Sequence, residues 1–272
     1  MTLYVMIGLP GSGKSTIAEK YTHNIISTDD IREEFFTDDP YPIVEKRLIE
    51  SLKKQRDVLI DATNLTRKNR RNYLMFAKQR KARTVAVVLL TPFDVCLERQ
   101  LKRKRNVPKD VIKKYACSFQ FPAPKEFDEV IVVQSELDEL KVDTDIPQDN
   151  PHHTLSLSEH MSRTAECVRD SLKEAALNHD IGKVFTKTYI NSHGEHTEEA
   201  HYYGHESFGA YYYLTSHKAT KEVQHIGQLI NYHMRPFVWE KSKKAYNRDL
   251  KEFGKDFMEE LKELHEADKK AC

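Results

Sequence analysis

The residues with the clearest chemistry lie near the amino terminus, in the segment GLPGSGKST at positions 8–16. This segment matches G-x-x-x-x-G-K-[ST] between a predicted strand and a predicted helix, the context that makes the motif specific. In such a loop, backbone N–H groups and the helix dipole bind phosphates, the lysine bridges the β and γ phosphates, and the next hydroxyl holds Mg²⁺. The alternative is a glycine-rich turn that binds no ligand. The residues predicted to bind ATP, or another nucleoside triphosphate, with Mg²⁺ are Gly8, Pro10, Gly11, Ser12, Gly13, Lys14, Ser15 and Thr16.

Two further segments place polar groups where predicted strands end. In STDDIR (27–32), the carboxylate of Asp29 can accept a hydroxyl proton, and Arg32 shares its helical face and can clamp a phosphate. The segment DATNL (61–65) presents polar groups at the same edge of the sheet, where ligands bind in α/β folds. Helix capping, a surface arginine and ordinary turn chemistry are the alternative interpretations. The pattern favours an acceptor site beside the phosphate loop.

Positive charge is concentrated in residues 67–114, which hold 16 basic and 3 acidic side chains. Arg99 and Arg103 lie four apart on a predicted helix, precede Lys104 and Arg105, and could fold over the phosphates as a lid. The alternative is a solvated helical face. The charge favours a polynucleotide over a small sugar as the acceptor, because a nucleic-acid strand needs a positive groove. Few aromatic residues accompany it, so contacts to phosphates rather than to bases are expected.

The second half of the chain has a different chemistry, since 12 of the 13 histidines follow residue 150. Imidazole and carboxylate groups in such number suit Mn, Fe, Co, Ni or Zn. A metal site of this kind brings a bound water toward a neutral pKa, and Lys183 could neutralise charge on a phosphate. For each histidine alone, a surface or core position is the alternative. His196 and His201 are expected to be exposed to solvent, and Trp239 is expected in the core or at its rim.

The hydrophobic pattern predicts two kinds of architecture. In the first half, predicted strands alternate with predicted helices, which indicates an α/β domain with a parallel sheet covered on both faces. The acidic, proline-containing stretch 134–153 is the expected linker, and after it only helical spacing recurs, so the second half is expected to be all-α. The predicted domains are residues 1–146 and 147–272. The strands are expected at 3–7, 25–27, 58–61, 85–90 and 130–133, and the helices at 15–21, 43–55, 67–79, 93–104, 109–119, 155–173, 175–181, 204–216, 220–233 and 250–270.

The composition is that of a globular protein. Of 272 residues, 39% are apolar and 31% are charged. The apolar runs are too short for a membrane span, and the amino terminus has no secretory signal, so a cytoplasmic location is expected. The four cysteines, Cys96, Cys117, Cys167 and Cys272, form no C-x-x-C pair, which favours reduced thiols over disulfides.

Residues 1–133 resemble the 5′-hydroxyl polynucleotide kinase domain of phage and eukaryotic end-repair enzymes. The resemblance rests on GLPGSGKST, TDDIR, DATNL and the arginine-rich run that leads into NVPKDV at 106–111. It implies that Asp29 is the general base, that Arg32 holds the 3′-phosphate of the acceptor, and that Arg99 and Arg103 stabilise the transferring phosphoryl group. Asp61 stands one residue earlier than in the phage form, which leaves its role open. Small P-loop kinases in general share the loop and a DATN-like strand, so small-molecule acceptors remain an alternative.

Residues 152–272 resemble the HD phosphohydrolase superfamily, whose pattern is His, then His-Asp, then a final Asp on helices. The local likeness is carried by EHM, NHDIGK, YYGHE and HEADK, as in HD domains attached to CCA-adding enzymes and RNA-repair kinases. The final aspartate could also be Asp249, although Asp268 is favoured. The resemblance implies one or two divalent metals held by His160, His179, Asp180, His205, His233 and Asp268.

Together the two resemblances imply a bifunctional end-healing enzyme that cooperates with an RNA ligase. One domain would phosphorylate 5′-OH ends of RNA or DNA, and the other would remove 2′,3′-cyclic or 2′/3′-phosphates. A second hypothesis joins a nucleoside or small-metabolite kinase to an HD nucleotidase. A third is a sensor whose ATP site is a switch and whose HD cluster is only structural.

Overall fold

The computed structural model describes residues 1–103, 106–151 and 154–271. The chain forms two compact units, which we call the first and the second unit. The first consists of Met1–Tyr115 and Glu126–Glu136, and the second of Ala116–Lys125 and Leu137–Cys272. The predicted domain boundary at residue 146 stays a prediction, and the chain passes between the units three times.

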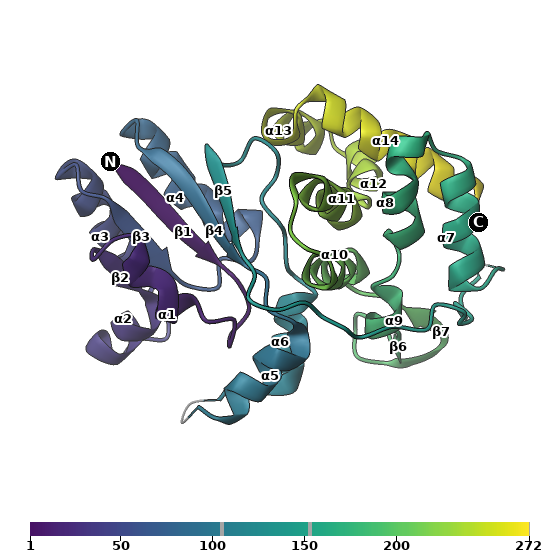
Figure 1. The fold of residues 1–272 in the computed structure, drawn as a ribbon, viewed down its shortest axis with the longest axis horizontal. Helices are drawn as coiled ribbons and strands as arrows, with labels where there is room; N and C mark the ends of the chain where they lie inside the picture. Colours follow the sequence, from purple (N-terminus) through teal and green to yellow (C-terminus); the bar gives the residue numbers. More distant parts are fainter. Residues whose placement is uncertain (104–105, 152–153, 272) are drawn as a thin grey trace. The chain divides into compact units, whose positions relative to one another are not determined.

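The first unit is built on a parallel sheet, as its alternating pattern predicted (Figure 1). The strand order is β2-β3-β1-β4-β5, and every pairing is parallel. Ser27 at the end of β2 pairs in register with Asp61 at the end of β3. The chain segments that follow these strands therefore emerge side by side at the carboxyl edge. The strands are β1 (Thr2–Ile7), β2 (Ile25–Ser27), β3 (Val58–Asp61), β4 (Arg83–Leu89) and β5 (Glu129–Val133).

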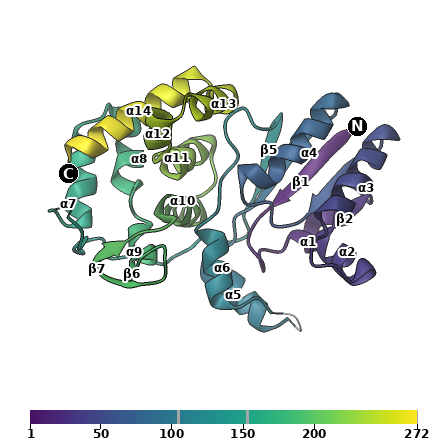
Figure 2. The same cartoon turned by 180° about the vertical axis from the view of Figure 1, so that it is seen from behind.

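Helices cover both faces of this sheet. On one face, Met6, Leu59 and Val87 form a buried cluster with Ala18, which lies just after α1. On the other face, α3 and α4 pack on β3 and β4 (Figure 2). Burial on both faces explains why the strands read as nearly continuous apolar runs. The helices are α1 (Lys14–Ile17), the 3₁₀ turn η1 (Ala18–Lys20), α2 (Thr28–Phe35), α3 (Tyr41–Lys53), α4 (Arg67–Gln79), α5 (Phe93–Leu101) and α6 (Lys109–Ala116).

The helices of the first unit depart from the expectation in several places, of which three bear on the site. The expected helix at 15–21 is one α-turn followed by a 3₁₀ turn. Helix α2 is longer than the helical turn expected around Asp29 and Arg32, because its run of charged residues hides its fully buried apolar residue, Ile31. Ser27 caps it by accepting a hydrogen bond from the Asp30 N–H. Helix α5 ends at Leu101 rather than at 104, and the predicted lid residues Lys104 and Arg105 lie outside the described residues.

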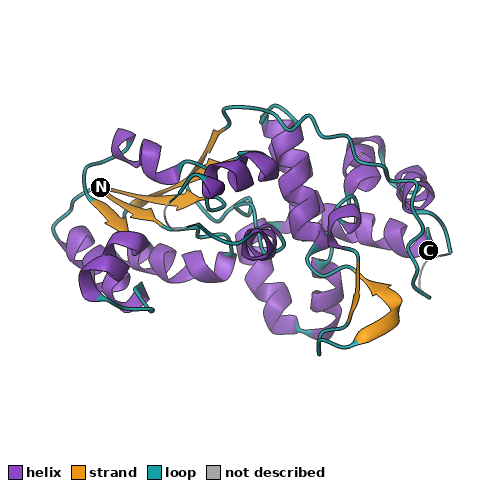
Figure 3. Ribbon diagram, turned by 90° about the horizontal axis from the view of Figure 1, so that it is seen from below, coloured by secondary structure: helices purple, strands orange, loops and turns teal. Residues whose placement is uncertain are grey.

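The second unit is mostly helical, as expected (Figure 3). It differs from an all-α fold in one antiparallel pair, β6 (Thr188–Ile190) with β7 (His196–His201). The pair escaped detection because its strands are short and largely polar, so they lack an apolar run. Its helices are α7 (Leu157–Glu166), the 3₁₀ turn η2 (Asp170–Leu172), α8 (Lys173–Asn178), α9 (Lys183–Thr186), α10 (His205–Ser216), α11 (Lys221–Tyr232), α12 (Arg235–Lys241), α13 (Lys243–Phe253) and α14 (Lys255–Lys270).

Two features shape the second unit beyond its helices. The single helix expected at 250–270 is broken at Gly254, whose φ of 82° separates α13 from α14. Segment 116–125 is clamped by α11: Asn231 accepts from the Phe121 N–H at 2.7 Å and donates to the Phe119 carbonyl at 2.9 Å. Residues that follow α6 directly in the sequence therefore belong to the core of the second unit.

Across the described ranges, we find no helix that is both long enough and apolar enough to cross a bilayer.

Candidate active sites

The phosphate loop leads from the end of β1 into α1, and glycines allow its tight path. Gly11 and Gly13 have φ values of 88° and 96°, in the left-handed region that favours glycine. A Cβ on Gly11 would lie 2.5 Å from the backbone oxygen of Cys96, so no larger residue fits there. The N–H of Gly8 donates to the Thr63 carbonyl at 3.1 Å. The loop that the motif predicted is therefore held against the end of β3.

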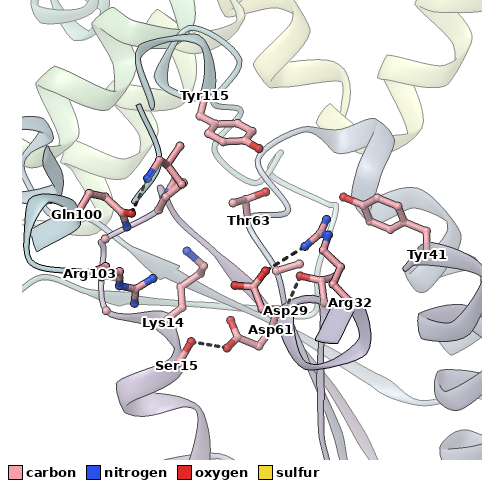
Figure 4. A pocket seen from close by; sticks show the side chains of 16 residues that line it. Lys14, Ser15, Asp29, Arg32, Tyr41, Asp61, Thr63, Gln100, Arg103 and Tyr115 are labelled. Atoms are coloured by element: carbon pink, nitrogen blue, oxygen red, sulfur yellow. Dashed lines mark hydrogen bonds and ion pairs between the residues drawn. The ribbon is translucent and has the colours of Figure 1, made fainter. Parts of the chain in front are cut away.

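Lys14 lies inside this loop and is buried. Its Nζ donates to the carbonyls of Gly8 at 3.0 Å and Leu9 at 2.8 Å. Burial lowers the pKa of Lys14 to about 8, although the nearby Asp61 opposes the shift. Figure 4 shows the ammonium group directed into a cavity whose opposite side carries Asp29 and Arg32.

A hydrogen bond between Ser15 and Asp61 joins Asp61 to the phosphate loop. Ser15 Oγ donates to Asp61 Oδ2 at 2.7 Å (Figure 4). Burial raises the pKa of Asp61, and the Ser15 hydrogen bond opposes the rise. A hydroxyl and a carboxylate at the end of a phosphate loop are the oxygen ligands that Mg²⁺ prefers in phosphoryl-transfer sites.

The acceptor side of the cavity is formed by the first turns of α2. Arg32 donates to Asp29 Oδ1 at 3.0 Å, and the Asp29 side chain is 75% exposed. Both side chains line a cavity of about 340 Å³ together with Lys14 and Asp61. The structure therefore brings together the loop lysine, the predicted base and the predicted phosphate clamp. Tyr41 and Tyr115 also line this cavity, and the sequence analysis did not single them out (Figure 4).

A second cavity, of about 370 Å³, lies beside the same loop. Gly11 and Gly13 border both cavities, and Arg103 also borders both. Arg99 lines the second cavity only, and its guanidinium pairs with Glu136 at 3.0 Å. The two predicted lid arginines thus lie at the phosphate loop.

A buried ion pair lies beside the chain segment that lines the acceptor cavity, and it was not predicted from the sequence. The fully buried Arg70 pairs with Glu126 through two hydrogen bonds of 2.7 and 2.9 Å. The same guanidinium donates to the carbonyls of Asn64 and Leu65, at 2.9 and 3.1 Å. The pair therefore holds the turn that follows β3, the strand that ends at Asp61. No local sequence signal could reveal it, because its partners are 56 residues apart.

The second site gathers six side chains from distant parts of the second unit. His160 lies on α7, His205 begins α10 and Asp268 lies on α14. His179 and Asp180 directly follow α8, and His233 directly follows α11. All six belong to two overlapping groups that share Asp180, and within each group the ligand atoms lie within 4.8 Å of one another.

The carboxylate of Asp180 lies between the two groups. Its Oδ2 is 3.5 Å from Nε2 of both His160 and His179, while its Oδ1 is 3.1 Å from Nε2 of His205. Asp268 Oδ1 completes the first group at 3.0 Å from His160 Nε2. A carboxylate with one oxygen in each group has the geometry of a bridge between two cations.

Backbone hydrogen bonds orient three of the histidines. The Nδ1–H groups of His179, His205 and His233 donate to main-chain carbonyls at 2.7, 2.8 and 2.7 Å. A carbonyl only accepts, so the proton lies on Nδ1 and the Nε2 lone pair faces the cluster. This is the arrangement by which proteins present imidazole to a metal.

The charges of the cluster are tightly coupled. Burial alone would raise the pKa of Asp180, but Lys183 and the histidines hold it well below its usual range. Burial opposes protonation of His160, yet Asp180 and Asp268 raise its pKa to about 9. Lys183 Nζ lies 2.6 Å from Asp180 Oδ2 and donates to Gln148 Oε1 at 2.7 Å. Gln148 lies in the stretch 134–153 that was expected to be a linker, so its contact with Lys183 was not predicted.

These residues fit a divalent transition metal. His179 Nε2 is buried, and among the described residues it makes no hydrogen bond, although it lies 3.5 Å from Asp180 Oδ2 and from Asp268 Oδ1. A buried imidazole nitrogen aimed between two carboxylates is costly unless a cation or a proton compensates it. Neutral imidazoles with carboxylates are the donor set expected for Mn, Fe, Co, Ni or Zn.

Three other residues of the second unit have defined places. Asp249, the alternative final ligand, lies outside the cluster and accepts hydrogen bonds from Arg235 and from the indole of Trp239. Trp239 is buried, as expected. The expectation that His201 is exposed is wrong: it is half-buried, because the β6–β7 pair folds it toward the cluster.

Comparisons with known families match each half of the chain separately. Residues 3–122 match the family described as AAA domain, and residues 151–271 match the family described as HD domain. The L-seryl-tRNA(Sec) kinase of Methanococcus maripaludis is 28% identical over 193 residues, which cover 62% of this chain and 74% of that protein.

Solved structures are less similar. A gluconokinase from Sinorhizobium meliloti is 18% identical, with a TM-score of 0.36, over 48% of this chain and 81% of that one. A chain of the Pnkp1/Rnl/Hen1 complex is 23% identical, with a TM-score of 0.34, over 55% of this chain and 52% of that one. Each family match agrees with the site found in the same half of the chain. The chain therefore joins a P-loop kinase domain to an HD-type phosphohydrolase domain.

Proposed function

We propose that this protein heals the broken ends of nucleic-acid strands, RNA in particular. The P-loop domain phosphorylates 5′-OH ends with ATP, and the HD domain removes 2′,3′-cyclic or 2′/3′-phosphates. The products, a 5′-phosphate and a 3′-hydroxyl, are the ends that an RNA ligase joins. The observation that carries this proposal is the cavity where Lys14, Asp29 and Arg32 meet.

In the kinase reaction, each group near the phosphate loop has a defined task. Asp29 accepts the proton of the attacking hydroxyl, and Arg32 binds a phosphate of the acceptor strand. Lys14 binds the β and γ phosphates of ATP, and Ser15 with Asp61 holds Mg²⁺. Arg99 and Arg103 neutralise charge on the transferring phosphoryl group. An exposed carboxylate suits Asp29, because the acceptor and its proton must reach it from solvent.

In the hydrolysis reaction, the six-residue cluster would hold one or two divalent metals. When bound, such metals supply a water of lowered pKa and polarise the phosphoryl oxygens. The neighbouring Lys183 binds the substrate phosphate and offsets its charge, since its ammonium group already lies at the rim of the cluster. The main-chain carbonyls that hold Nδ1 of His179, His205 and His233 keep the donor set in place.

Two observations support a nucleic-acid substrate. Residues 67–114 hold 16 basic and 3 acidic side chains, and a polyanion is the partner that such a segment favours. The relative from M. maripaludis is, by its name, a kinase of a seryl-tRNA, so a related kinase acts on an RNA-linked substrate.

A second candidate is a nucleoside or small-metabolite kinase joined to an HD nucleotidase. The size of the acceptor cavity, about 340 Å³, favours it, because a single nucleoside or sugar would fill that volume. The two candidates differ in whether the acceptor continues beyond the cavity as a strand.

One RNA tests both activities. A 5′-OH oligonucleotide ending in a 2′,3′-cyclic phosphate is incubated with ATP, Mg²⁺ and Mn²⁺, and both ends are resolved. We expect Lys14→Ala to abolish only 5′ phosphorylation, and Asp180→Ala to abolish only 3′-end healing. Lys20→Ala and Asp170→Ala are matched controls, because both side chains are exposed and lie outside the two sites.

The outcomes separate the candidates. If the wild-type protein leaves the RNA untouched while nucleosides and mononucleotides turn over, the end-healing proposal is wrong and the small-substrate candidate replaces it. If neither class of substrate reacts and the purified protein carries no transition metal, both are wrong and the sensor hypothesis remains.

A further inference from the structure

The His/Asp cluster opens into a cavity of about 690 Å³ within the second unit. Asp180, His205 and Asp268 line one part of it, and aromatic residues contributed by the β6–β7 region and α12 line another. The volume exceeds what a phosphate group needs and lies in the range of cavities that bind small organic ligands. The aromatic part has no task in phosphate hydrolysis itself, so it calls for a different explanation.

The aromatic part contains a ring stack that is already formed. The rings of His201 and Tyr203 lie 5.5 Å apart with an interplanar angle of 14°. Thr197 Oγ1 contacts His201 Nε2 at 3.1 Å and fixes the inner ring. Tyr203, the outer ring, is 49% exposed and lines the cavity, so a planar group could add to the stack. Phe237 contributes a second aromatic surface to the same cavity.

The polar part of the cavity is suited to phosphate. Lys183 lies at the cluster, and Lys269 is the second cation in the lining. The Lys269 ammonium lies 5.6 Å from the centre of the Phe237 ring and pairs with Glu240 at 2.8 Å, which holds it beside the cavity. One cavity thus offers cations and a metal-type cluster in one part and flat rings in another.

We propose that this cavity is a nucleotide subsite in which the base stacks on Tyr203 while the phosphate lies at the His/Asp cluster. A nucleoside phosphate is the ligand class that carries both a plane and a phosphate. A sugar phosphate without a base would present no planar group to Tyr203 or Phe237. Base stacking on aromatic side chains tolerates every base, which suits strand ends of any sequence. This inference rests on the proposed phosphohydrolase function and adds its specificity-determining residue.

Binding measurements test the subsite directly. The probes are adenosine 3′-phosphate, an RNA hexamer with a 3′-phosphate, and ribose 5-phosphate, which has no base. Calorimetry on the full chain compares the wild-type protein with Tyr203→Ala, Tyr203→Phe and His196→Ala. His196 is the matched control, because it is an exposed aromatic residue at the start of β7, the strand that ends two residues before Tyr203, and it does not line the cavity. Thermal melting confirms that each variant is folded.

We expect Tyr203→Ala to weaken binding of the adenosine probe about tenfold, the usual scale for one stacked base. Tyr203→Phe and His196→Ala retain wild-type affinity, and ribose 5-phosphate binds all four proteins equally. Equal binding of the adenosine probe to wild type and Tyr203→Ala would overturn the subsite. Tighter binding of the hexamer than of the mononucleotide identifies an RNA end as the source of the base, and the reverse order identifies a free nucleotide.

The same experiment keeps the two proposals apart. If binding depends on Tyr203 but no probe that carries a phosphate is hydrolysed with any divalent metal, the phosphohydrolase proposal fails and the subsite stands. If the probes are hydrolysed with equal KM by wild type and Tyr203→Ala, the phosphohydrolase stands and the subsite fails.

Discussion

The two sites of this protein are built in opposite ways. The phosphate loop is a local structure of nine consecutive residues, and most of its binding groups belong to the backbone. The His/Asp cluster is assembled from side chains on helices α7 and α14 and at the ends of α8, α10 and α11. The loop presents neutral N–H groups to a ligand, whereas the cluster concentrates charged groups in the interior, where a bound cation would compensate the carboxylates. The sites should therefore fail under different perturbations.

Metal removal should give the largest contrast. Dialysis against a strong chelator, followed by Mg²⁺ alone, should reduce phosphohydrolase activity by about 10³-fold, since a metal-generated nucleophile is worth several kcal/mol. Kinase activity should return fully, because Mg²⁺ is an ordinary cofactor of phosphoryl transfer. Both reactions are assayed on one preparation, with bound metal determined by elemental analysis. Retained hydrolysis in metal-free protein would contradict the assignment of the cluster.

Two aspartates of the second unit, the buried Asp249 and the half-buried Asp268, should respond differently to amidation. Asp249→Asn should lower the free energy of unfolding by about 2–3 kcal/mol, because it removes the charge of a fully buried carboxylate that pairs with the partly exposed Arg235. Asp268→Asn should destabilise less but reduce the bound metal. Chemical denaturation and elemental analysis separate the two effects. Loss of metal from the Asp249→Asn protein while it is still folded would show that Asp249 belongs to the site.

Glycine substitutions test whether the backbone path of the phosphate loop requires residues without a side chain. Gly11→Ala should lower the free energy of unfolding of the first unit by about 2–3 kcal/mol, from a strained φ and a clash with the Cys96 carbonyl. Gly194→Ala is the control, since it shares a positive φ of 86° but meets no atom within 4 Å. Equal melting temperatures for the two variants would mean that the loop can shift to accept a side chain.

The lowered pKa of Lys14 predicts a pH dependence of ATP binding. Phosphates favour the charged ammonium, so binding raises its pKa above the free value of about 8. The affinity for ATP is then at its maximum below pH 8, where Lys14 is charged, and falls by up to about tenfold per pH unit above pH 8. Titrations of ATP from pH 7 to 9.5 measure the slope. Lys14→Arg should flatten it, because a guanidinium stays charged throughout; an unchanged slope would assign the dependence to another group.

The smallest effect on the free energy of unfolding is expected for a substitution at the acceptor cavity. Arg32→Ala breaks an exposed ion pair with Asp29 and should change the free energy of unfolding by less than about 1 kcal/mol. The KM for a 5′-OH acceptor should nevertheless rise, because in the proposed reaction the guanidinium binds the acceptor phosphate. Denaturation and steady-state kinetics on one variant distinguish a binding residue from a structural one. An unchanged KM would remove Arg32 from the acceptor site.

Sequence alone was sufficient for the features whose signal is local. The glycines and Lys14 of the phosphate loop are contiguous, and the apolar runs from β1 to β5 predicted a parallel sheet correctly. The six residues of the cluster, which are distant in the sequence, were predicted from a family resemblance carried by short motifs, and the structure places them together. Local patterns succeed here because the backbone geometry of a loop, and the burial of a strand, depend mainly on neighbouring residues.

Only the tertiary structure decided the features that join distant residues. The Arg70–Glu126 pair, the contact of Gln148 with Lys183 and the place of Asp249 outside the cluster depend on chain segments brought together by folding. The β6–β7 pair and the stack of His201 on Tyr203 are of the same kind, since their strands lack an apolar pattern. The physical reason is that a polar side chain has no periodic signal of its own: its partner is set by the fold, which alone determines whether it faces solvent, an ion pair or a ligand.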